Sequence, residues 1–388
     1  MRELRHVVWV SEGASPDGGA ARYVWETARE LKLRGVRSTL LYDPGSPAPA
    51  ELLEIFDGAF PLLEPARQIS ELAPDVVYAH RLPSGVSEEA LAAAGRPVVR
   101  FFHDHQLFCL REHKYRTLGL SPCSEAVGMR CYACLGFVAK TPELPRFRLR
   151  TVGALRARQR ANLAFSSFVV GSQAMARQLD LHGFPAARVH VVPLYAPQPA
   201  TDVVATRGKR LLYIGALTRG KGLDVLLRAL ARVSPAVALD VVGRGPQEDE
   251  WRALSSSLGL DERVAFLGPR HASALASLYR EALAVVVPSR APETFGLVGV
   301  EAMSHGTPTI ASVAGGIEEW LEDGVTGVGV VPGDDVALAR AITGLASDAD
   351  AARAMGDAGR RAHRAKFLPE HHVAALLPVL DAAARGAA

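Results

Sequence analysis

Short apolar runs alternate with amphipathic segments along the first half of this chain. Because strands and helices differ in period, short apolar runs predict buried strands and a longer amphipathic segment predicts a helix. The expected strands are residues 6–10, 36–42, 76–79, 97–102, 168–172 and 189–193. Residues 20–35 predict a helix between the first two strands, ended by Gly35. A strand, helix, strand order predicts a parallel sheet.

The pattern starts again after the linker YAPQPATD at residues 195–202. Further strands and helices are expected from residue 209, and helices alone from residue 335. The sequence therefore predicts an α/β protein with one domain at 1–197 and another at 207–366. A last helix is expected at 367–388. The letters DAD at 348–350 fall in a helical segment, so we treat their likeness to a metal-binding motif as coincidence.

Composition and charge exclude several classes of protein. The chain has 388 residues, 48% of them hydrophobic and 22% charged, which suits globular domains with real cores. A formal net charge of +3 gives no reason to expect nucleic acid as a partner. No apolar run approaches the ~18 residues that a membrane span needs. We therefore expect a soluble, cytoplasmic protein.

Most of the candidate ligand-binding residues lie between Ala284 and Pro332. An apolar run is followed by a loop that carries Glu293 and then by a helix beginning near Phe295, with Glu301 in its second turn. The unpaired backbone N–H groups that open a helix attract anions, so Phe295, Gly296 and Leu297 suit a phosphate. Carboxylates are poor partners for phosphate, but they accept hydrogen bonds from the hydroxyls of a sugar or ribose.

The two glutamates, the FG after the first of them, EAMSHGTP and AGGIEEWLEDGVTGVGVVPGD together resemble the donor-site signature of the retaining family 4 glycosyltransferases. This resemblance implies the GT-B fold, in which two Rossmann-like, doubly wound parallel-sheet domains face a central cleft. It implies a UDP- or GDP-sugar donor in the second domain and an acceptor in the first, either a glycan, a lipid-linked compound or a small molecule. Glu293 would contact the transferred hexosyl group and Glu301 the ribose, with no catalytic metal.

The resemblance extends to the first domain, and it implies that the last helix, 367–388, packs back on that domain. The loop Asp17-Gly18-Gly19 matches a glycine loop that approaches the donor phosphates. His103, at the end of the strand 97–102, matches a histidine beside the transferred sugar. Polar residues at strand ends line the ligand crevice of α/β sheets, so Asp104 and His105 are alternatives if the strand boundary shifts. A surface or supporting role for the imidazole stays open.

In the second domain, the family pattern has a glycine, an arginine and a later lysine that bind the diphosphate. Gly215 and Lys221 match it, but Ala216 stands where the arginine is expected. We propose that Arg219 or Arg244 substitutes; a solvated turn residue is an equally good interpretation of Arg219. Gly243 belongs to a turn that resembles those contacting the nucleotide base. A nucleotide-sugar epimerase on this fold, or a binding protein without turnover, are the alternative functions.

Residues 106–145 form an expected insertion that contains every cysteine of the chain. These cysteines are Cys109, Cys123, Cys131 and Cys134. Four thiolates, two of them in a C-x-x-C pair, favour a structural zinc site over an iron–sulfur cluster, which uses the same ligands. Incidental reduced thiols are the other interpretation.

A run of arginines follows the insertion: Arg146, Arg148, Arg150, Arg156, Arg158 and Arg160. Such a run suits a phosphorylated acceptor or peripheral contact with an anionic membrane surface, at the inner face of the membrane. A solvated helix face is an equally good explanation.

Overall fold

The computed structural model describes residues 4–16, 18–116, 121–140, 147–199 and 208–386. Contacts divide the chain into two compact units. The first contains Met1–Glu112, Glu125–Pro193 and Pro369–Ala388, and the second contains His113–Ser124 and Leu194–Leu368. The sequence assigned residues 113–124 to the first domain, whereas their contacts place them with the second. Asp17, Arg146 and the end of the predicted linker lie outside the described residues.

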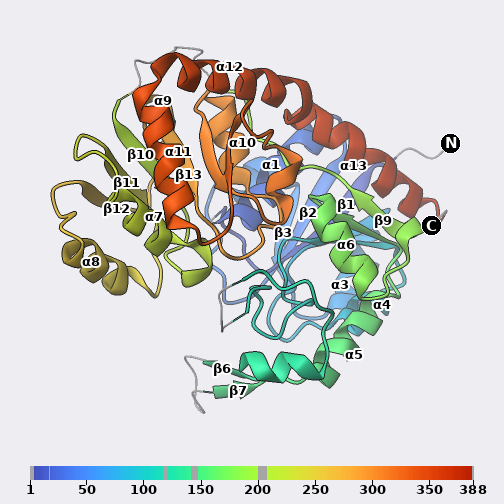
Figure 1. Ribbon diagram of the computed structural model, residues 1–388. Coiled ribbons are helices and arrows are strands. Elements are labelled where there is room, and N and C mark those ends of the chain that lie inside the picture. Colours follow the sequence, from blue (N-terminus) through green and yellow to red (C-terminus); the bar gives the residue numbers. More distant parts are fainter. Residues whose placement is uncertain (1–3, 17, 117–120, 141–146, 200–207, 387–388) are drawn as a thin grey trace. The chain divides into compact units, whose positions relative to one another are not determined.

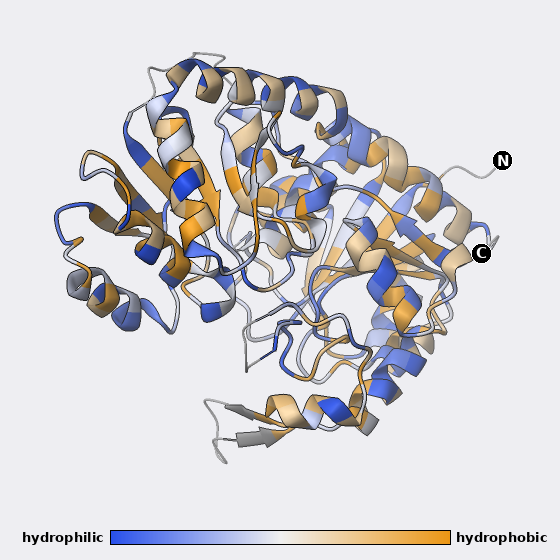
Figure 2. Ribbon diagram, in the orientation of Figure 1, coloured by the Kyte–Doolittle hydropathy of each residue, from blue (hydrophilic) through white to orange (hydrophobic). Residues whose placement is uncertain are grey.

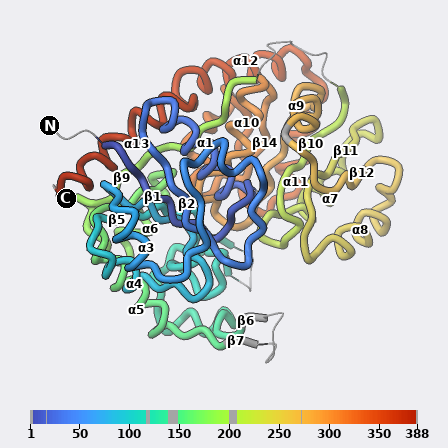
Figure 3. Tube along the Cα trace, turned by 180° about the vertical axis from the view of Figure 1, so that it is seen from behind, coloured from blue at the N-terminus to red at the C-terminus, as the bar shows by residue number. Residues whose placement is uncertain are grey.

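The first unit is built on a seven-stranded sheet in the order β3-β2-β1-β4-β5-β8-β9, and every pairing in it is parallel (Figures 1 and 3). Its strands are β1 (His6–Ser11), β2 (Arg37–Tyr42), β3 (Gly58–Pro61), β4 (Val76–Ala79), β5 (Val98–Phe102), β8 (Ser167–Val170) and β9 (Val189–Val191). The order reverses between β1 and β4. This is the switch point at which doubly wound sheets bind ligands.

The first unit's helices are α1 (Gly19–Lys32), α2 (Leu52–Ile55), α3 (Pro65–Leu72), α4 (Glu88–Ala92), α5 (Val152–Asn162), α6 (Gln173–Leu181) and α13 (Pro369–Ala384). The last helix, α13, packs against α1 and β4, and His372 on it contacts Tyr23 and the Pro193 carbonyl. The insertion is partly regular: it contains a short 3-10 helix at Met129–Cys134 and the strand β6 (Val138–Lys140), which pairs antiparallel with β7 (Phe147–Leu149) just after the insertion. A second short 3-10 helix, Ala186–Arg188, directly precedes β9.

The second unit has a six-stranded parallel sheet in the order β12-β11-β10-β13-β14-β15. Its strands are β10 (Arg210–Ile214), β11 (Ala238–Val242), β12 (Val264–Gly268), β13 (Ala284–Val287), β14 (Thr309–Ser312) and β15 (Gly327–Val330). Its helices are α7 (Leu223–Leu230), α8 (Glu248–Ser257), α9 (Ala272–Glu281), α10 (Leu297–Ser304), α11 (Asp335–Ser347) and α12 (Ala349–Lys366). Counted along the chain, the strand order is 3-2-1-4-5-6, the Rossmann order, with its switch point between β10 and β13.

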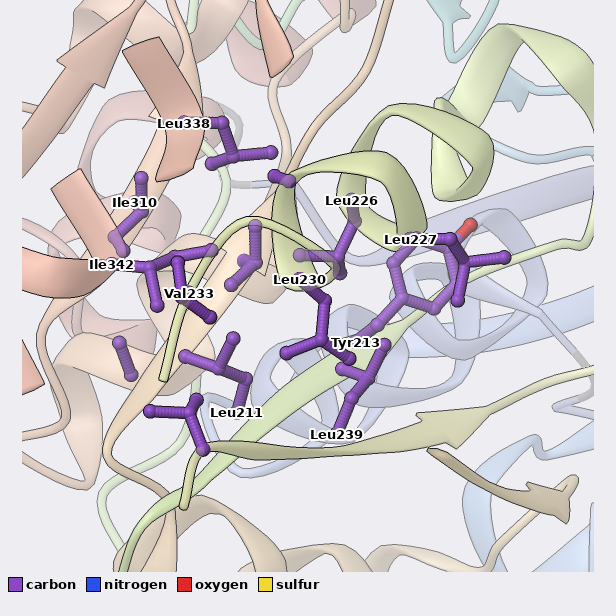
Figure 4. Packing of buried hydrophobic residues seen from close by; sticks show 14 of the residues in the cluster. Leu211, Tyr213, Leu226, Leu227, Leu230, Val233, Leu239, Ile310, Leu338 and Ile342 are labelled. Carbon is purple, nitrogen blue, oxygen red and sulfur yellow. The ribbon is translucent and has the colours of Figure 1, made fainter. Parts of the chain in front are cut away.

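Both faces of the second sheet are buried, as parallel sheets require. One face packs against α7, α8 and α11 through residues such as Leu211, Leu226 and Ile342 (Figure 4). The other packs against α9, α10 and α12 through Val285, Met303 and Phe367. In Figure 2 the strands carry mainly hydrophobic colours, whereas α12 mixes both. This double burial explains why the strands show continuous apolar runs rather than alternation.

Two details bear on the sequence predictions. Asp348, the first residue of DAD, is the N-cap of α12, and its carboxylate accepts a hydrogen bond from the Ala351 amide at 2.9 Å.

Among the helices of the described residues, none is long and apolar enough to cross a membrane.

Candidate functional site

The turn after β10 brings Lys221 to the switch point of the second sheet. Arg219–Lys221 form a short 3-10 turn, and Gly222 then adopts a left-handed backbone with φ of 70°. A side chain at Gly222 would lie 1.9 Å from the carbonyl oxygen of Pro288, so only glycine allows the two loops to approach this closely. The amides of Arg290 and Ala291 both donate to the Gly220 carbonyl, at 2.9 and 3.0 Å. The turns after β10 and β13 are therefore fastened together.

Lys221 and Glu293 meet across these fastened turns. The Lys221 ammonium donates to both carboxylate oxygens of Glu293, at 2.8 and 2.9 Å. The Ser289 hydroxyl donates to Oε1 of the same carboxylate at 2.5 Å. The Glu293 side chain is 12% exposed and that of Lys221 is 38% exposed. The carboxylate is thus held from two sides, while the Lys221 side chain stays partly exposed to solvent.

Glycines behind Glu293 fix its backbone. The Glu293 carbonyl accepts from the Gly316 amide at 2.7 Å. Side chains at Gly315 and Gly316 would stand 2.2 and 2.5 Å from the carbonyl oxygens of Glu293 and Thr294. The AGG sequence therefore allows one loop to pack directly on the backbone of the other.

Helix α10 begins at Leu297, two residues later than expected, and Gly296 precedes it in a left-handed conformation. The Gly299 amide donates to the Gly296 carbonyl at 2.9 Å, and the two amides before it, of Leu297 and Val298, precede the intrahelical ladder and open beside the Glu293 loop. Phe295 is 1% exposed, so it offers a ligand only its backbone, and its carbonyl accepts from the Trp320 indole at 2.8 Å. This geometry keeps the predicted anion-binding end of the helix in place.

Glu301 lies in the second turn of α10, as the sequence predicts. Its Oε2 accepts a hydrogen bond from the Tyr279 hydroxyl at 2.6 Å, and the Tyr279 ring stacks on His305 with centroids 5.1 Å apart. Burial and nearby arginines lower the pKa of His305 to about 4, so this imidazole is neutral at pH 7. One carboxylate of the site is thus paired with a cation and the other with a neutral hydroxyl.

The arginines around the site differ in their engagement. Arg219 donates to both carboxylate oxygens of Glu250, at 3.0 and 3.1 Å, in an exposed ion pair. Arg244 is exposed, and its side chain forms no hydrogen bond or ion pair with the described part of the chain. Arg290, which sequence analysis missed, forms a buried two-bond ion pair with Asp224. The sequence offered one signal for this pair, because Arg290 stands in the loop after β13 and Asp224 stands in the first turn of α7, two residues after Gly222.

Gly243 supports the site through its backbone. It has φ of 134°, and a Cβ there would lie 2.0 Å from the Gly215 carbonyl oxygen. The turns after β10 and β11 pack against each other at this point. The contact of Gly243 with a nucleotide base stays a prediction. The close packing of the two turns is by itself a reason for a glycine at this position.

In the first unit, Gly18 and Gly19 stand where α1 begins. Gly18 is its N-cap with φ of 87°, and no side chain caps the helix. The amides at this end of a helix that follows β1 therefore remain available to an anion.

His103 follows β5 and contacts His80, which follows β4. His80 Nδ1 and His103 Nε2 are 2.8 Å apart, and Trp9 stacks on His80 with the rings 8° from parallel. Burial lowers the pKa of His103 to about 3 and that of His80 well below its usual value, so both imidazoles are neutral at pH 7. Asp104, the alternative to His103, accepts from Arg81 at 2.6 Å. His105, the other alternative, is 6% exposed.

The cysteines are half-buried thiols. Cys123 belongs to the second unit, while Cys109, Cys131 and Cys134 belong to the first. Within the described residues, no three or more Cys, His, Asp or Glu side chains form a group that could hold a metal ion. The Sγ of Cys131 instead accepts from the Gly128 amide at 3.5 Å. The four-cysteine zinc site gains no support from this arrangement and stays a prediction.

Several arginines of the basic run make internal contacts. Arg158 on α5 pairs with the buried Glu88 at 2.8 Å, Arg156 donates to the Val127 carbonyl, and Arg150 pairs with Glu112 at 2.7 Å. A solvated helix face, one of the two explanations of the arginine run, therefore does not account for these three residues.

The two Rossmann-like sheets, with polar residues gathered at their strand ends, define a protein of the GT-B class. The sequence profile of Glycosyltransferase Family 4 matches residues 17–194, and that of Glycosyl transferases group 1 matches residues 200–362. A D-inositol 3-phosphate glycosyltransferase 1 of Catenulispora acidiphila is 31% identical over 96% of this chain and 93% of that protein. The chain belongs to glycosyltransferase family 4, and it is a glycosyltransferase.

Solved structures agree on the fold. Anabaena Alr3699/HepE in complex with UDP and glucose superposes with a TM-score of 0.73 at 22% identity, over 97% of this chain and 99% of that one. A sucrose-phosphate synthase from Thermosynechococcus elongatus gives a TM-score of 0.68 at 21% identity, over 96% and 97%. The predicted fold of two Rossmann-like parallel-sheet domains is confirmed.

Proposed function

We propose that the protein transfers a hexosyl group from a nucleoside diphosphate sugar to an acceptor, with retention of the anomeric configuration. The observation that carries this proposal is the arrangement at the second switch point, where Lys221, Glu293 and the start of α10 converge. A diphosphate would be bound by the Lys221 ammonium and the α10 amides. Glu293 would accept from hydroxyls of the sugar, and Glu301 from the ribose.

Arg244 is the better candidate for the missing arginine partner of Lys221. Arg219 already pairs with Glu250, whereas the Arg244 side chain has no partner in the described part of the chain. Both stand in turns at the carboxyl ends of neighbouring strands, β10 and β11. Positive charge at this edge would stabilise the leaving diphosphate, whose oxygen would take the acceptor proton on the same face of the sugar. Catalysis of this kind rests on electrostatic preorganisation.

The first donor to test is UDP-glucose, because UDP and glucose are bound in the similar Anabaena structure. A GDP-sugar is the alternative. The first acceptors to test are D-inositol 3-phosphate, after the relative that carries this name, and neutral polyols. The first unit, with His103, Gly18 and Gly19, would serve the acceptor and the donor phosphates.

A thermal-shift screen over nucleotide sugars identifies the donor, since a bound ligand stabilises the folded chain by mass action. With that donor, Lys221→Ala and Glu293→Ala should each lower turnover by about 10²- to 10³-fold. The matched control is Lys209→Ala, an exposed lysine at the opposite end of β10, which should keep the wild-type rate. Near wild-type rates in both site variants would refute the assignment.

Product analysis separates the alternatives. Conversion of the nucleotide sugar with no acceptor present would identify an epimerase. Tight binding without release of nucleoside diphosphate, across all acceptors, would identify a binding protein. The anomeric configuration of the product, read by NMR, tests retention.

Contact with an anionic membrane surface stays a proposal. It is supported by exposed apolar side chains in the same part of the first unit as the arginine run, including Met129, Leu135 and Leu149, each more than 60% exposed. Apolar and basic groups together favour the interface of anionic vesicles. Co-sedimentation with phosphatidylglycerol vesicles, and none with phosphatidylcholine vesicles, is the expected result.

A further inference from the structure

Arg100 is a buried cation in the middle of β5. It is 6% exposed, and its neighbours along the strand are Val98, Val99, Phe101 and Phe102. Its Nε and Nη1 atoms are buried and have no hydrogen-bond partner in the described part of the chain. Burial lowers its pKa only to about 10, so the guanidinium is charged at pH 7. An unpaired buried charge is costly, and such groups are found with a counter-charge.

A small hollow lies against this guanidinium, under the carboxyl ends of β4 and β5. Its polar lining is Arg100, His80, Arg81, His103, Asp104, Gln106 and Arg158. It has room for about one water-sized sphere. Both carboxylates near it are already paired, Asp104 with Arg81 at 2.6 Å and Glu88 with Arg158 at 2.8 Å. Because both histidines are neutral, Arg100 is the charge left without a direct partner.

His80 supplies a second unused polar atom. Its Nε2 is buried and has no partner, while its Nδ1 is hydrogen-bonded to His103. If His103 donates in that bond, the neutral His80 carries its proton on Nε2 and becomes a donor. The hollow would then present donors from Arg100 and His80. Because these donor atoms of Arg100 and His80 have no acceptor in the described part of the chain, they favour an anion over a neutral molecule in the hollow.

We propose that this hollow is an anion site, which takes one oxygen of a phosphate or carboxylate group, or a halide of similar size. Its position at the strand ends of an α/β sheet is where ligands bind. The anion has two sources, a free inorganic ion or an anionic group on the acceptor. The second source rests on the proposed function.

The test of the site uses the full chain and inorganic phosphate at constant ionic strength, with chloride and acetate as further probes. Thermal-shift titration of the wild type should give a saturable rise in Tm. Arg100→Met should weaken phosphate binding by about 10- to 100-fold, the loss of charge-assisted hydrogen bonds. Arg96→Met is the matched control, an exposed arginine four residues earlier, and should bind like the wild type.

A readout on the wild type covers the case in which Arg100→Met fails to fold. In ¹⁵N-labelled protein, one arginine Nε–H signal protected from exchange should shift on titration with phosphate. No saturable rise in Tm with any anion, or equal binding by Arg100→Met and Arg96→Met, overturns the proposal.

The source of the anion is decided with the donor present. If the acceptor supplies it, D-inositol 3-phosphate should be a better acceptor than inositol, inorganic phosphate should compete with it, and Arg100→Met should raise its KM about 10-fold or more. Phosphate binding that depends on Arg100, without an advantage for the phosphorylated acceptor, assigns the site to a free inorganic ion only. Donor binding by Arg100→Met should be unchanged, so a wild type that binds no nucleotide sugar would mark failure of the proposed function instead.

Discussion

The ion pair between Lys221 and Glu293 should contribute measurably to the stability of the second unit. Glu293→Gln removes the negative charge and keeps the shape of the side chain, and Lys221→Met removes the positive charge. The pair makes two short contacts, 2.8 and 2.9 Å, and the carboxylate is only 12% exposed. A double-mutant cycle isolates the interaction of these two side chains from their other contacts.

The magnitude follows from burial. Two unit charges about 4 Å apart attract by roughly 4 kcal/mol at an effective dielectric constant of about 20. The exposed side of Lys221 and the desolvation of Glu293 both reduce this value. We therefore expect a coupling free energy of about 1–2 kcal/mol. The Ser289 hydroxyl contacts the same carboxylate, so Glu293→Gln alone should cost somewhat more than Lys221→Met alone.

Urea unfolding of the four proteins, followed at Trp251 and Trp320 of the second unit, measures the coupling. The control cycle is Arg252 with Glu248 on α8 of the same unit, a pair at 2.8 Å whose side chains are 49% and 32% exposed. That pair should couple by about 0.3–0.5 kcal/mol. A Lys221–Glu293 coupling no larger than this control would refute the argument from burial.

Three further outcomes are expected. Gly243→Ala should destabilise the second unit by about 3 kcal/mol, because the glycine has a positive φ and a Cβ there would lie 2.0 Å from the Gly215 carbonyl oxygen. Its control is Gly344→Ala, at an open position inside α11, which should stabilise the unit by about 0.5–1 kcal/mol in the same urea assay. Burial lowers the pKa of His372 from 6.5 to about 4, so the unfolded chain binds the proton first and stability is lost as pH falls below 6.5. His372→Gln should therefore remove about 1–2 kcal/mol of the stability difference between pH 7 and pH 5. Metal analysis of protein purified without oxygen tests the cysteines, and less than about half an equivalent would exclude a zinc or iron–sulfur site.

The sequence predicts those features of the site that depend on local order along the chain. Strand, loop and helix follow one another around Glu293 and Glu301 as expected, because parallel α/β units place the carboxyl end of a strand and the start of the next helix together. His103 likewise follows the strand whose end was predicted. The start of α10 was placed two residues early, since Gly296 takes a left-handed conformation that ends the loop.

Contacts between distant segments could not be predicted in this way. Tyr279 reaches Glu301 from the preceding helix, and Arg290 pairs with Asp224 across 66 residues. The position of residues 113–124 depends on their packing, including Tyr115 against Gly220. The surroundings of Arg100 could not be predicted either. An apolar run with one charged residue predicts a strand correctly and says nothing about where the charge finds its partner.

The contacts of Lys221 indicate how the predicted catalytic pair would act. A lysine ammonium has three donors, and Glu293 accepts two of them, which leaves one N–H for another acceptor. A diphosphate oxygen could take this third bond without breaking the ion pair, with Glu293 holding the lysine in place. Removing either residue would then disable the other. The double variant Lys221→Ala with Glu293→Ala should lose little more kcat/KM than the worse single variant, whereas multiplied losses would show that the two residues act independently.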